Sequence, residues 1–251
     1  MTTIRLSTRR RALLAGLAPV GGALLPGVLS KMPPTYGHIL RMGDNLTYAA
    51  HRLLLPGDAL VREYSRGDIT SFPATGTTSP GDTKSPLSGA YREVQRAAFA
   101  GWRLSVEGRV ARPRSFSLAD LKAFAARTQI TRHTCEEGWS AIAEWTGVPL
   151  GLILDAAGIL PTARFVVFYS YDDWTDCIDL PDARHPQTIL AYGMNGRDLP
   201  IPHGAPVRLR VERQMGYKSM KFLHRIVVTD EFDDGGDKGN IQNGWAWYTG
   251  I

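Results

Sequence analysis

Cys135 is the side chain best suited to metal or redox chemistry, and charged residues surround it. Arg132 and His133 precede it closely, and Glu136 and Glu137 follow it directly. A thiolate is the soft, anionic ligand that suits a redox-active metal held by a sulfur-rich cofactor. Arg132 and His133 would favour the thiolate form if they face it. Glu137 is either a proton relay or a solvated turn residue. The segment therefore predicts a metal ligand.

The second of the 2 cysteines, Cys177, lies where polar and apolar residues alternate. That pattern favours a small, buried side chain on a β-strand. A disulfide between Cys135 and Cys177 is the alternative, because an exported chain meets an oxidising compartment.

A second group of candidates for binding lies near the C-terminus. His203 and Arg208 are followed by a glycine-led segment that contains Lys218 and Lys221. Glycines let the backbone approach a ligand closely, and arginine and lysine can clamp a phosphate. The spacing matches neither a Gly-x-Gly-x-x-Gly nor a Walker sequence. Two edge strands with solvated basic side chains are the alternative explanation.

The N-terminus is typical of an export signal. Arg9, Arg10 and Arg11 precede an uncharged, weakly hydrophobic run at 12–29, which indicates a twin-arginine signal peptide at residues 1–30. Glycines and prolines in the run weaken a helix, so a permanent membrane span is the less favoured alternative. This route exports folded proteins, usually because a cofactor is inserted in the cytoplasm. We therefore expect a cofactor and a periplasmic location.

The net charge gives little support for nucleic-acid binding. The formal charge is +5, but the leader contributes four of the positive charges and the rest of the chain is close to neutral. With 43% apolar residues, the chain can form one sizeable core.

The elements that must position these candidates change character near residue 100. We expect residues 31–100 to form an arm, with a helix at 45–55, that packs on an oxidoreductase domain at 101–251. Helix and turn signals stand at Ser117 with Asp120, at Pro149 with Gly158 and at Asn195 with Gly196. Strands are expected at 103–107, 129–133, 165–171, 189–194, 206–212 and 222–229. Without regularly alternating helices, these strands predict an α+β fold, with a mixed β-sheet core and flanking helices.

Three ordered motifs carry a resemblance to a known family. They occupy residues 132–140, residues 185–196, and residues 203–208 with 216–221. Together they closely resemble the molybdopterin domain of the sulfite oxidase family, over about residues 102–229. Within that family the chain is most similar to bacterial twin-arginine-exported members, such as the catalytic subunits of periplasmic methionine sulfoxide reductases. The resemblance implies a sulfite-oxidase-type molybdopterin-binding fold and a molybdenum-molybdopterin cofactor.

The resemblance also implies roles for individual residues. Cys135 would be the thiolate ligand of molybdenum. Beside this, we expect Arg132 to contact the substrate, with support of the loop as its alternative role, and Glu137 stays the candidate proton relay. Thr75 is the candidate replacement for an asparagine that relatives contribute to the pterin from the N-terminal arm. The other expected cofactor contacts are Ser170, His203, Arg208, Ser219, Met220 and Lys221.

The implied activity is two-electron transfer of an oxygen atom to or from a small substrate. Both S-oxide reduction and sulfite-like oxidation remain open, and Thr134 stands where the methionine sulfoxide reductase has an arginine. No haem domain is fused, so we expect a separate membrane b-type cytochrome to exchange electrons with a monomeric catalytic subunit.

Two other classes of function remain open. One is a non-catalytic binding module that retains the molybdopterin fold without the metal. The other is a cysteine hydrolase that pairs Cys135 with His185 or His203. The acidic tract at 230–237 favours a solvated loop over a cytochrome-docking or calcium site, because its spacing misses the EF-hand pattern.

Overall fold

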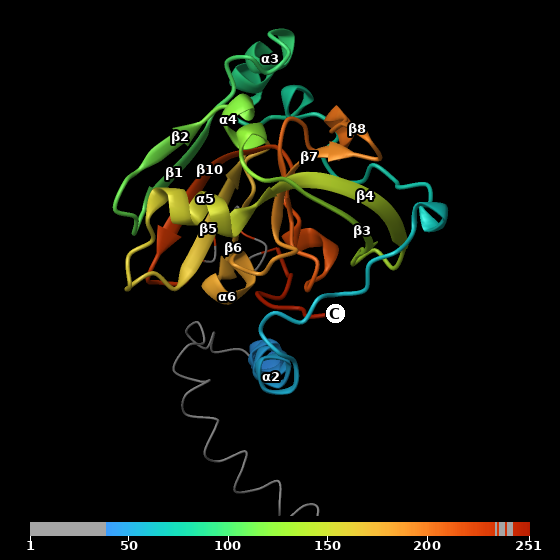
Figure 1. Ribbon diagram of the computed structural model, residues 1–251, viewed down its shortest axis with the longest axis vertical. Coiled ribbons are helices and arrows are strands. Elements are labelled where there is room, and N and C mark those ends of the chain that lie inside the picture. The colour runs from blue at the N-terminus through green and yellow to red at the C-terminus, as the bar shows by residue number, and fades with distance from the viewer. Residues whose placement is uncertain (1–38, 234, 236–238, 240–242) are drawn as a thin grey trace, which may run out of the picture.

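The computed structural model describes residues 39–233, 235, 239 and 243–251, and Figure 1 shows two β-sheets flanked by short helices. The expected signal peptide lies outside the described residues, and so does part of the acidic tract. Within the described ranges, no helix combines the length and the apolar character needed to cross a membrane.

Sheet 1 is mixed, with five strands in the order β2-β1-β10-β5-β6. Its strands are β1 (Leu104–Gly108), β2 (Arg114–Phe116), β5 (Phe165–Ser170), β6 (Thr175–Asp179) and β10 (Leu223–Thr229). β1 and β10 run parallel, and the other neighbours are antiparallel. The β-branched and aromatic residues of β5 and β10 suit a pleated, packed surface.

Sheet 2 is antiparallel and leads into the candidate site. Its strands are β3 (Arg127–Thr134), β4 (Ser140–Pro149), β7 (Ile189–Met194), β8 (Arg197–Asp198) and β9 (Arg208–Arg210). β3 pairs with β4 along its full length, so the turn between them, which carries Cys135, is held at both ends. The predicted hairpin joins β7 to β8 through Asn195 and Gly196, whose φ angles are 51° and 74°.

One apolar core joins the two sheets. Leu104 and Phe168 of sheet 1 pack in the same cluster as Leu190 and Leu209 of sheet 2, all 0% exposed. Burying a side chain of this size contributes about 1.5–3 kcal/mol. The core therefore fixes the relative position of β3, β5 and β9, whose ends bear candidate site residues.

The predicted helix signals are confirmed at α4 (Leu118–Ala123) and α5 (Leu150–Ala157). Ser117 and Asp120 form a capping box, in which the Ser117 Oγ accepts from the Asp120 N–H at 3.1 Å. α5 ends at Gly158, whose φ of 72° suits a residue without a Cβ. The other short helices are η1 (Arg66–Asp68), η2 (Pro80–Asp82), α6 (Leu180–Ala183), η3 (Ile201–His203) and η4 (Gly216–Lys218).

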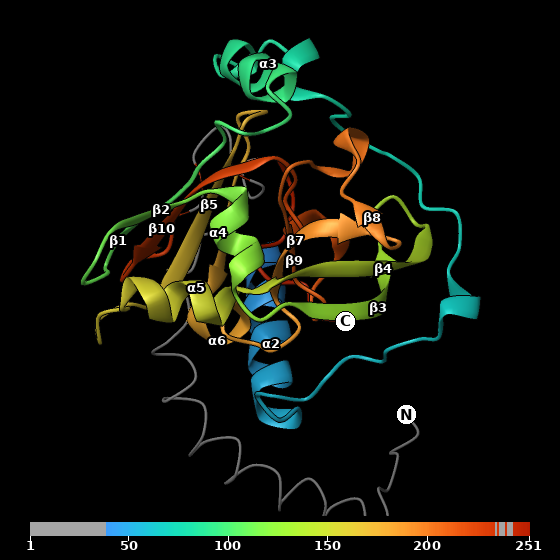
Figure 2. The same ribbon diagram turned by 45° about the horizontal axis from the view of Figure 1, so that its top comes forward.

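Residues after α2 hydrogen-bond to the strands of sheet 2. α2 (Ile39–Leu54) begins earlier than the predicted helix, and Figure 2 shows the chain running from α2 past the β3–β4 edge. The Tyr64 N–H donates to the Ile130 carbonyl at 2.8 Å, and the Thr70 N–H donates to the Ile142 carbonyl at 3.0 Å. The arm therefore continues the hydrogen bonding of sheet 2 toward the site.

β2 and β4 were not among the expected strands, and two further elements differ from the prediction. The stretch expected to be irregular contains α3 (Ser88–Arg96), which is held by the buried Tyr91, whose hydroxyl donates to the Ala205 carbonyl at 2.8 Å. The strand expected at 206–212 is shorter, since Pro206 has no N–H and the Val211 N–H donates to the Ser219 Oγ at 3.2 Å. The position of α3 therefore depends on a tertiary contact that local sequence does not encode.

Candidate functional site

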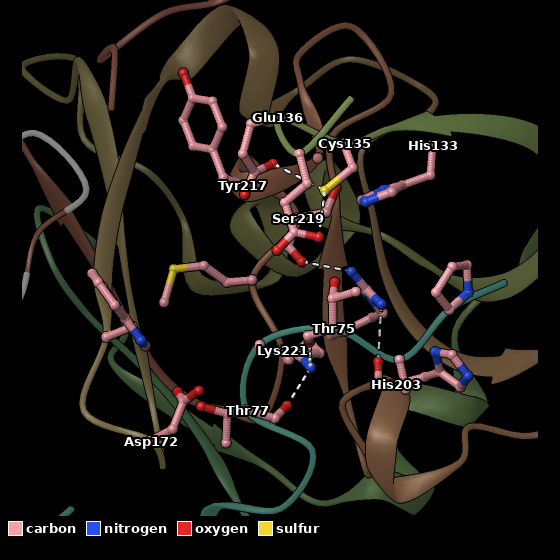
Figure 3. A pocket seen from close by; sticks show the side chains of 18 of the residues that line it. Thr75, Thr77, His133, Cys135, Glu136, Asp172, His203, Tyr217, Ser219 and Lys221 are labelled. Carbon is pink, nitrogen blue, oxygen red and sulfur yellow. Dashed lines mark hydrogen bonds between the residues drawn. The ribbon is translucent and has the colours of Figure 1, made fainter. Parts of the chain in front are cut away.

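A cavity of about 310 Å³ lies between the arm and the loops of the domain, and side chains from several elements converge on it (Figure 3). Arg132 and Lys218 are not part of its wall. The predicted site residues that line it are Thr75, Cys135, Glu137, Ser170, His203, Arg208, Ser219, Met220 and Lys221.

Cys135 lies at one end of the cavity, in the turn that joins β3 to β4. Its N–H donates to the Trp139 carbonyl at 2.9 Å, and Gly138 closes the turn with a φ of 90°. The Sγ lies 3.5 Å from the Glu136 Oε2 and 3.9 Å from the Glu137 Oε2. Burial and these carboxylates raise the pKa of the thiol to about 11. A metal cation is therefore the kind of partner that would hold this sulfur as a thiolate.

Of the two basic residues that precede Cys135, Arg132 does not line the cavity. Side chains alternate along β3, so His133 points into the protein while Arg132 is exposed, with its guanidinium 5.5 Å from the Tyr64 ring. His133 lines the cavity but carries no charge to offer the thiol, since burial and Arg210 strongly lower its pKa. The disulfide alternative is also wrong, since Cys135 and Cys177 are both buried and free.

Arg208 also lines the cavity, and among the described residues no carboxylate is bonded to it. It donates to the His203 carbonyl at 3.0 Å and to the Ser219 carbonyl at 2.8 Å. Its Nε is buried and has no hydrogen-bond partner in the part of the chain that the structure describes. Burial and the neighbouring Arg210 lower the pKa of the guanidinium well below its usual range. A buried cation bonded only to neutral groups is the kind of site that an anion completes.

Lys221 adds a second cation beside Arg208. Its Nζ donates to the Thr75 carbonyl at 2.8 Å and the Pro202 carbonyl at 3.2 Å, so the arm is tied to the cavity wall through backbone oxygens. Burial and Arg208 lower the pKa of Lys221 to about 8. Lys218, the other lysine proposed as a phosphate clamp, does not face the cavity, because its Nζ is buried against the Asp176 carboxylate at 2.6 Å.

The remaining predicted cofactor contacts also line the cavity wall. The Ser170 Oγ donates to the Asp172 carboxylate, and the Ser219 Oγ accepts from the Val211 N–H at 3.2 Å. Burial lowers the pKa of His203 to about 4, so the ring is neutral near pH 7. Met220 also lines the wall, while its carbonyl accepts from the Leu209 N–H at 2.8 Å.

Several lining residues were missed by the sequence reasoning. Tyr217 and Trp245 stack at 5.6 Å between ring centroids, and Trp174 is 38% exposed. We call Trp174, Tyr217 and Trp245 the aromatic rim, because all three line the cavity. Asp172 and Glu136 also face it. The aromatic-rich C-terminal end was the available signal for Trp245, but only the fold places it beside Tyr217.

The geometry argues against a cysteine hydrolase. His185 is buried away from the cavity lining, with its Nε2 3.1 Å from the Ala59 carbonyl. His203 lines the cavity. Within the described part of the chain, however, the Cys135 Sγ makes its polar contacts with carboxylates and not with an imidazole. A nucleophilic thiol needs a base within hydrogen-bond reach.

A soft ligand and paired cations in the wall of one cavity define a site for an anionic, metal-bearing redox cofactor. The sequence model of the family described as "Oxidoreductase molybdopterin binding domain" matches residues 91–236, and the chain belongs to this family.

Curated relatives agree with this family. A putative protein-methionine-sulfoxide reductase subunit YedZ1 from Azospira oryzae is 37% identical over 158 residues, covering 63% of this chain and 59% of that protein. The protein-methionine-sulfoxide reductase catalytic subunit MsrP from Xanthomonas campestris pv. campestris is 36% identical over 149 residues, covering 53% and 46%. The chain thus spans less than two thirds of the length of each relative.

A solved structure shares the fold. The crystal structure of the sulfane dehydrogenase SoxCD from Paracoccus pantotrophus matches with a TM-score of 0.50 and 25% identity, over 52% of this chain and 38% of that one. The predicted α+β, sulfite-oxidase-type molybdopterin-binding fold is confirmed.

The residues of the cavity fit the molybdopterin that the family binds. The unpaired Arg208 Nε and the neighbouring Lys221 suit its phosphate. Gly204 and Gly216 let Lys221 and His133 pack closely against the backbone, since a Cβ at Gly204 would overlap Lys221 and one at Gly216 would overlap His133. Cys135 supplies the soft ligand.

Proposed function

We propose that this chain is a molybdenum-molybdopterin oxidoreductase that reduces uncharged S-oxides by two-electron oxygen-atom transfer. The observation that carries the choice of substrate is the charge around Cys135. The relatives named as methionine-sulfoxide reductases support the same class of substrate.

The cavity near Cys135 is acidic. Glu136 and Glu137 both lie within 4 Å of the sulfur, at 3.5 Å and 3.9 Å, and Arg132 points away from it. The cations of the wall, Arg208 and Lys221, donate to backbone carbonyls. An anion such as sulfite would meet two like charges beside the sulfur. An S-oxide carries no net charge and avoids this repulsion.

The aromatic rim suits an organic sulfur group. Trp174, Tyr217 and Trp245 offer apolar faces at the cavity wall. Sulfur in a thioether packs favourably against aromatic rings, with about 0.3–1.5 kcal/mol for each contact. An inorganic anion gains nothing from such a surface, whereas a methionine S-oxide side chain does.

Each residue then has a defined task. Cys135 holds the metal, Arg208 and Lys221 hold the phosphate, and the cofactor supplies the two-electron redox chemistry when bound. Reduction of an S-oxide to a thioether and water consumes two electrons and two protons. Glu137 is the proton donor we favour, because the Trp139 Nε1–H donates to its Oε2 at 2.9 Å and orients it.

The cellular setting follows from the same proposal. We infer that residues 1–30 direct twin-arginine export to the periplasm, that 31–100 form the arm and that 101–251 form the catalytic domain. A separate membrane b-type cytochrome would deliver the electrons one at a time to a monomeric catalytic subunit.

The cofactor is tested by metal analysis and visible absorption of protein purified from a host that makes molybdopterin. We expect one molybdenum per chain and a thiolate-to-metal absorption band that Cys135→Ala abolishes. Metal-free wild-type protein from such a host would instead favour the non-catalytic binding module.

The substrate class is tested by comparing S-oxide reduction, with a reduced viologen dye, against sulfite oxidation, with ferricyanide. We expect wild-type kcat/KM to be higher for methionine S-oxide. In Glu136→Gln, kcat/KM for sulfite should rise roughly tenfold, because removing one like charge at about 4 Å is worth ~1–4 kcal/mol at a partly solvated site. Efficient sulfite oxidation by the wild type would contradict S-oxide reduction and favour sulfite-like oxidation instead.

A further inference from the structure

A buried polar network lies behind the cavity wall beside Cys135. It consists of Gln129 and His133 on β3, Arg210 on β9 and Glu212 just beyond β9, none more than 7% exposed. Buried charged groups are costly unless fully bonded, so a network of this kind needs a structural or functional reason. The function proposed above does not use these residues.

The network holds the Arg210 guanidinium in one orientation. Its Nε donates to the Glu212 Oε1 at 2.9 Å, and its Nη2 donates to the Glu212 Oε2 at 2.8 Å. The Gln129 Nε2 donates to the same Oε1 at 3.0 Å. The Trp145 ring also packs 4.4 Å from the guanidinium carbon. A two-pronged pair of this type fixes geometry as well as charge.

Arg210 in turn determines the hydrogen position on His133. The Arg210 Nη1 lies 2.8 Å from the His133 Nδ1. A guanidinium has only hydrogen-bond donors, so the Nδ1 must be the acceptor. The imidazole is then neutral, and its single ring hydrogen lies on the Nε2.

The other edge of the ring borders the cavity. His133, Cys135 and Gly216 are all part of the lining, and a Cβ on Gly216 would overlap the Nε2 edge of His133. Figure 3 shows the ring of His133 pointing toward the sulfur of Cys135. Phe72 packs against the ring at a centroid separation of 5.1 Å, which limits its rotation.

We propose that Arg210 is a positioning residue that holds His133 with its Nε2–H as a fixed hydrogen-bond donor toward the sulfur ligands of the metal bound at Cys135. This inference rests on the proposed molybdenum site. A donor to a ligating sulfur stabilises the more negatively charged, reduced centre and raises its reduction potential. The network therefore tunes the electron affinity of the site without adding a charge to it.

The test compares two substitutions of similar size. In His133→Gln the side-chain amide nitrogen can take the place of the Nε2, whereas in His133→Asn the amide reaches only the Nδ1 position. We measure the molybdenum potential and the energy of the thiolate-to-metal band in each holoenzyme. We expect the potential and the band energy of His133→Gln to stay near the wild-type values. His133→Asn should give a lower potential and a shifted band.

A second variant tests the role of Arg210 through its effect on His133. Arg210→Leu with Glu212→Leu removes both partners of the buried pair, which is tolerated better than removing one. Gln129 keeps its bond to the Gln187 carbonyl at 3.0 Å. With ¹⁵N-labelled histidine, we expect the hydrogen on the Nε2 in the wild-type holoenzyme and a mixture of tautomers in the double variant, with a potential shift like that of Asn.

The outcomes separate this inference from the proposed function. If metal is bound but neither His133→Asn nor the double variant moves the potential or the band, the positioning role is wrong and the enzyme assignment stands. A hydrogen on the His133 Nδ1 of the wild type would also overturn the positioning role of Arg210. If the wild type binds no molybdenum, the proposed function fails first, while the tautomer measurement still reports on the Arg210–His133 bond.

Discussion

The two cysteines show how much the surroundings of a side chain decide its chemistry. Both are buried and free, and burial raises the pKa of both thiols. Cys177 packs with Phe165 and Val167 and makes no part of the cavity wall. Cys135 has two carboxylates beside it and opens onto the cavity. Only Cys135 can therefore reach a bound metal.

Lys221 gives a prediction for pH at the residue scale. Its pKa is lowered from 10.5 to about 8 by burial and Arg208, and a bound phosphate would raise it again. The charged form binds the phosphate, so cofactor retention should fall as the pH rises from about 8 toward 10.5. Molybdenum loss during dialysis across this range measures it. Lys221→Arg stays charged and should lack the fall; an unchanged profile in both proteins would exclude Lys221 from phosphate binding.

The sequence predicted much of the candidate site because the relevant signals are local. A cysteine among charged residues and a glycine-rich basic segment identify Cys135, Arg208 and Lys221 without a structure. Arg132 was misplaced because strand alternation, which turns it outward, depends on the exact register of β3. Asp172 was missed because only the fold brings it to the cavity lining.

At the scale of elements, β3 and η4 meet at the cavity wall, close to Cys135. Gly216 starts η4 and lies against His133 and the Thr134 carbonyl, so a Cβ there would overlap the imidazole. This contact is between segments about eighty residues apart in sequence, and the motif spacing alone gives no sign of it. The glycine is required by close approach, since its φ is not in the left-handed region.

Gly216→Ala is accordingly expected to displace His133 or η4 and to reduce the molybdenum content of the purified protein severalfold. Overpacking of this kind typically costs 1–3 kcal/mol, which thermal unfolding would register as a lower Tm. Gly151→Ala in α5 is the matched control, because the nearest atoms to an added Cβ are those of the Arg184 backbone, 3.9 Å away. That variant should keep its metal and gain up to about 1 kcal/mol. Full metal content in Gly216→Ala would show that the loop adapts.

Elements with strong local signals were predicted well, and those defined by distant contacts were not. The capping box at Ser117 predicted the start of α4 to within a residue, and the stop at Gly158 predicted the end of α5 equally well. α3 was not predicted because it depends on the hydrogen bond from the Tyr91 hydroxyl to the Ala205 carbonyl, two residues that are 114 positions apart in sequence. Helix propensity is a weak guide where tertiary burial decides.

At the scale of the whole molecule, the arm is fastened to the domain by a buried ion cluster. Arg52 of α2 donates to both oxygens of Asp179, at 2.9 Å and 2.8 Å, and also pairs with Asp182 at 2.8 Å. The Tyr48 hydroxyl donates to Asp179 at 3.0 Å. The Trp247 ring packs at a tilt against the Tyr48 ring, with centroids 5.0 Å apart. The two ends of the described chain therefore meet at one point on the domain.

Removing Arg52 should loosen this junction in a pH-dependent way. Arg52→Ala leaves two buried carboxylates without their cation, which typically costs about 3–5 kcal/mol. Burial and Asp182 raise the pKa of Asp179 from 3.8 to about 6, while Arg52 lowers it. Because the folded pKa is raised, the stability contributed by Asp179 falls as the pH rises from 3.8 through 6. Without Arg52 that pKa rises further, so the loss should be larger at pH 7.5 than at pH 5.

Urea unfolding of the wild type and Arg52→Ala at both pH values measures this difference. Arg184→Ala is the control, because its partner Asp155 is 55% exposed and an exposed pair contributes less than about 1 kcal/mol. If the arm packs as one unit with the domain, Arg52→Ala should also shift the single unfolding transition to lower urea without splitting it. A separate early transition, with the domain unchanged, would mean that α2 folds onto the domain independently of the catalytic site.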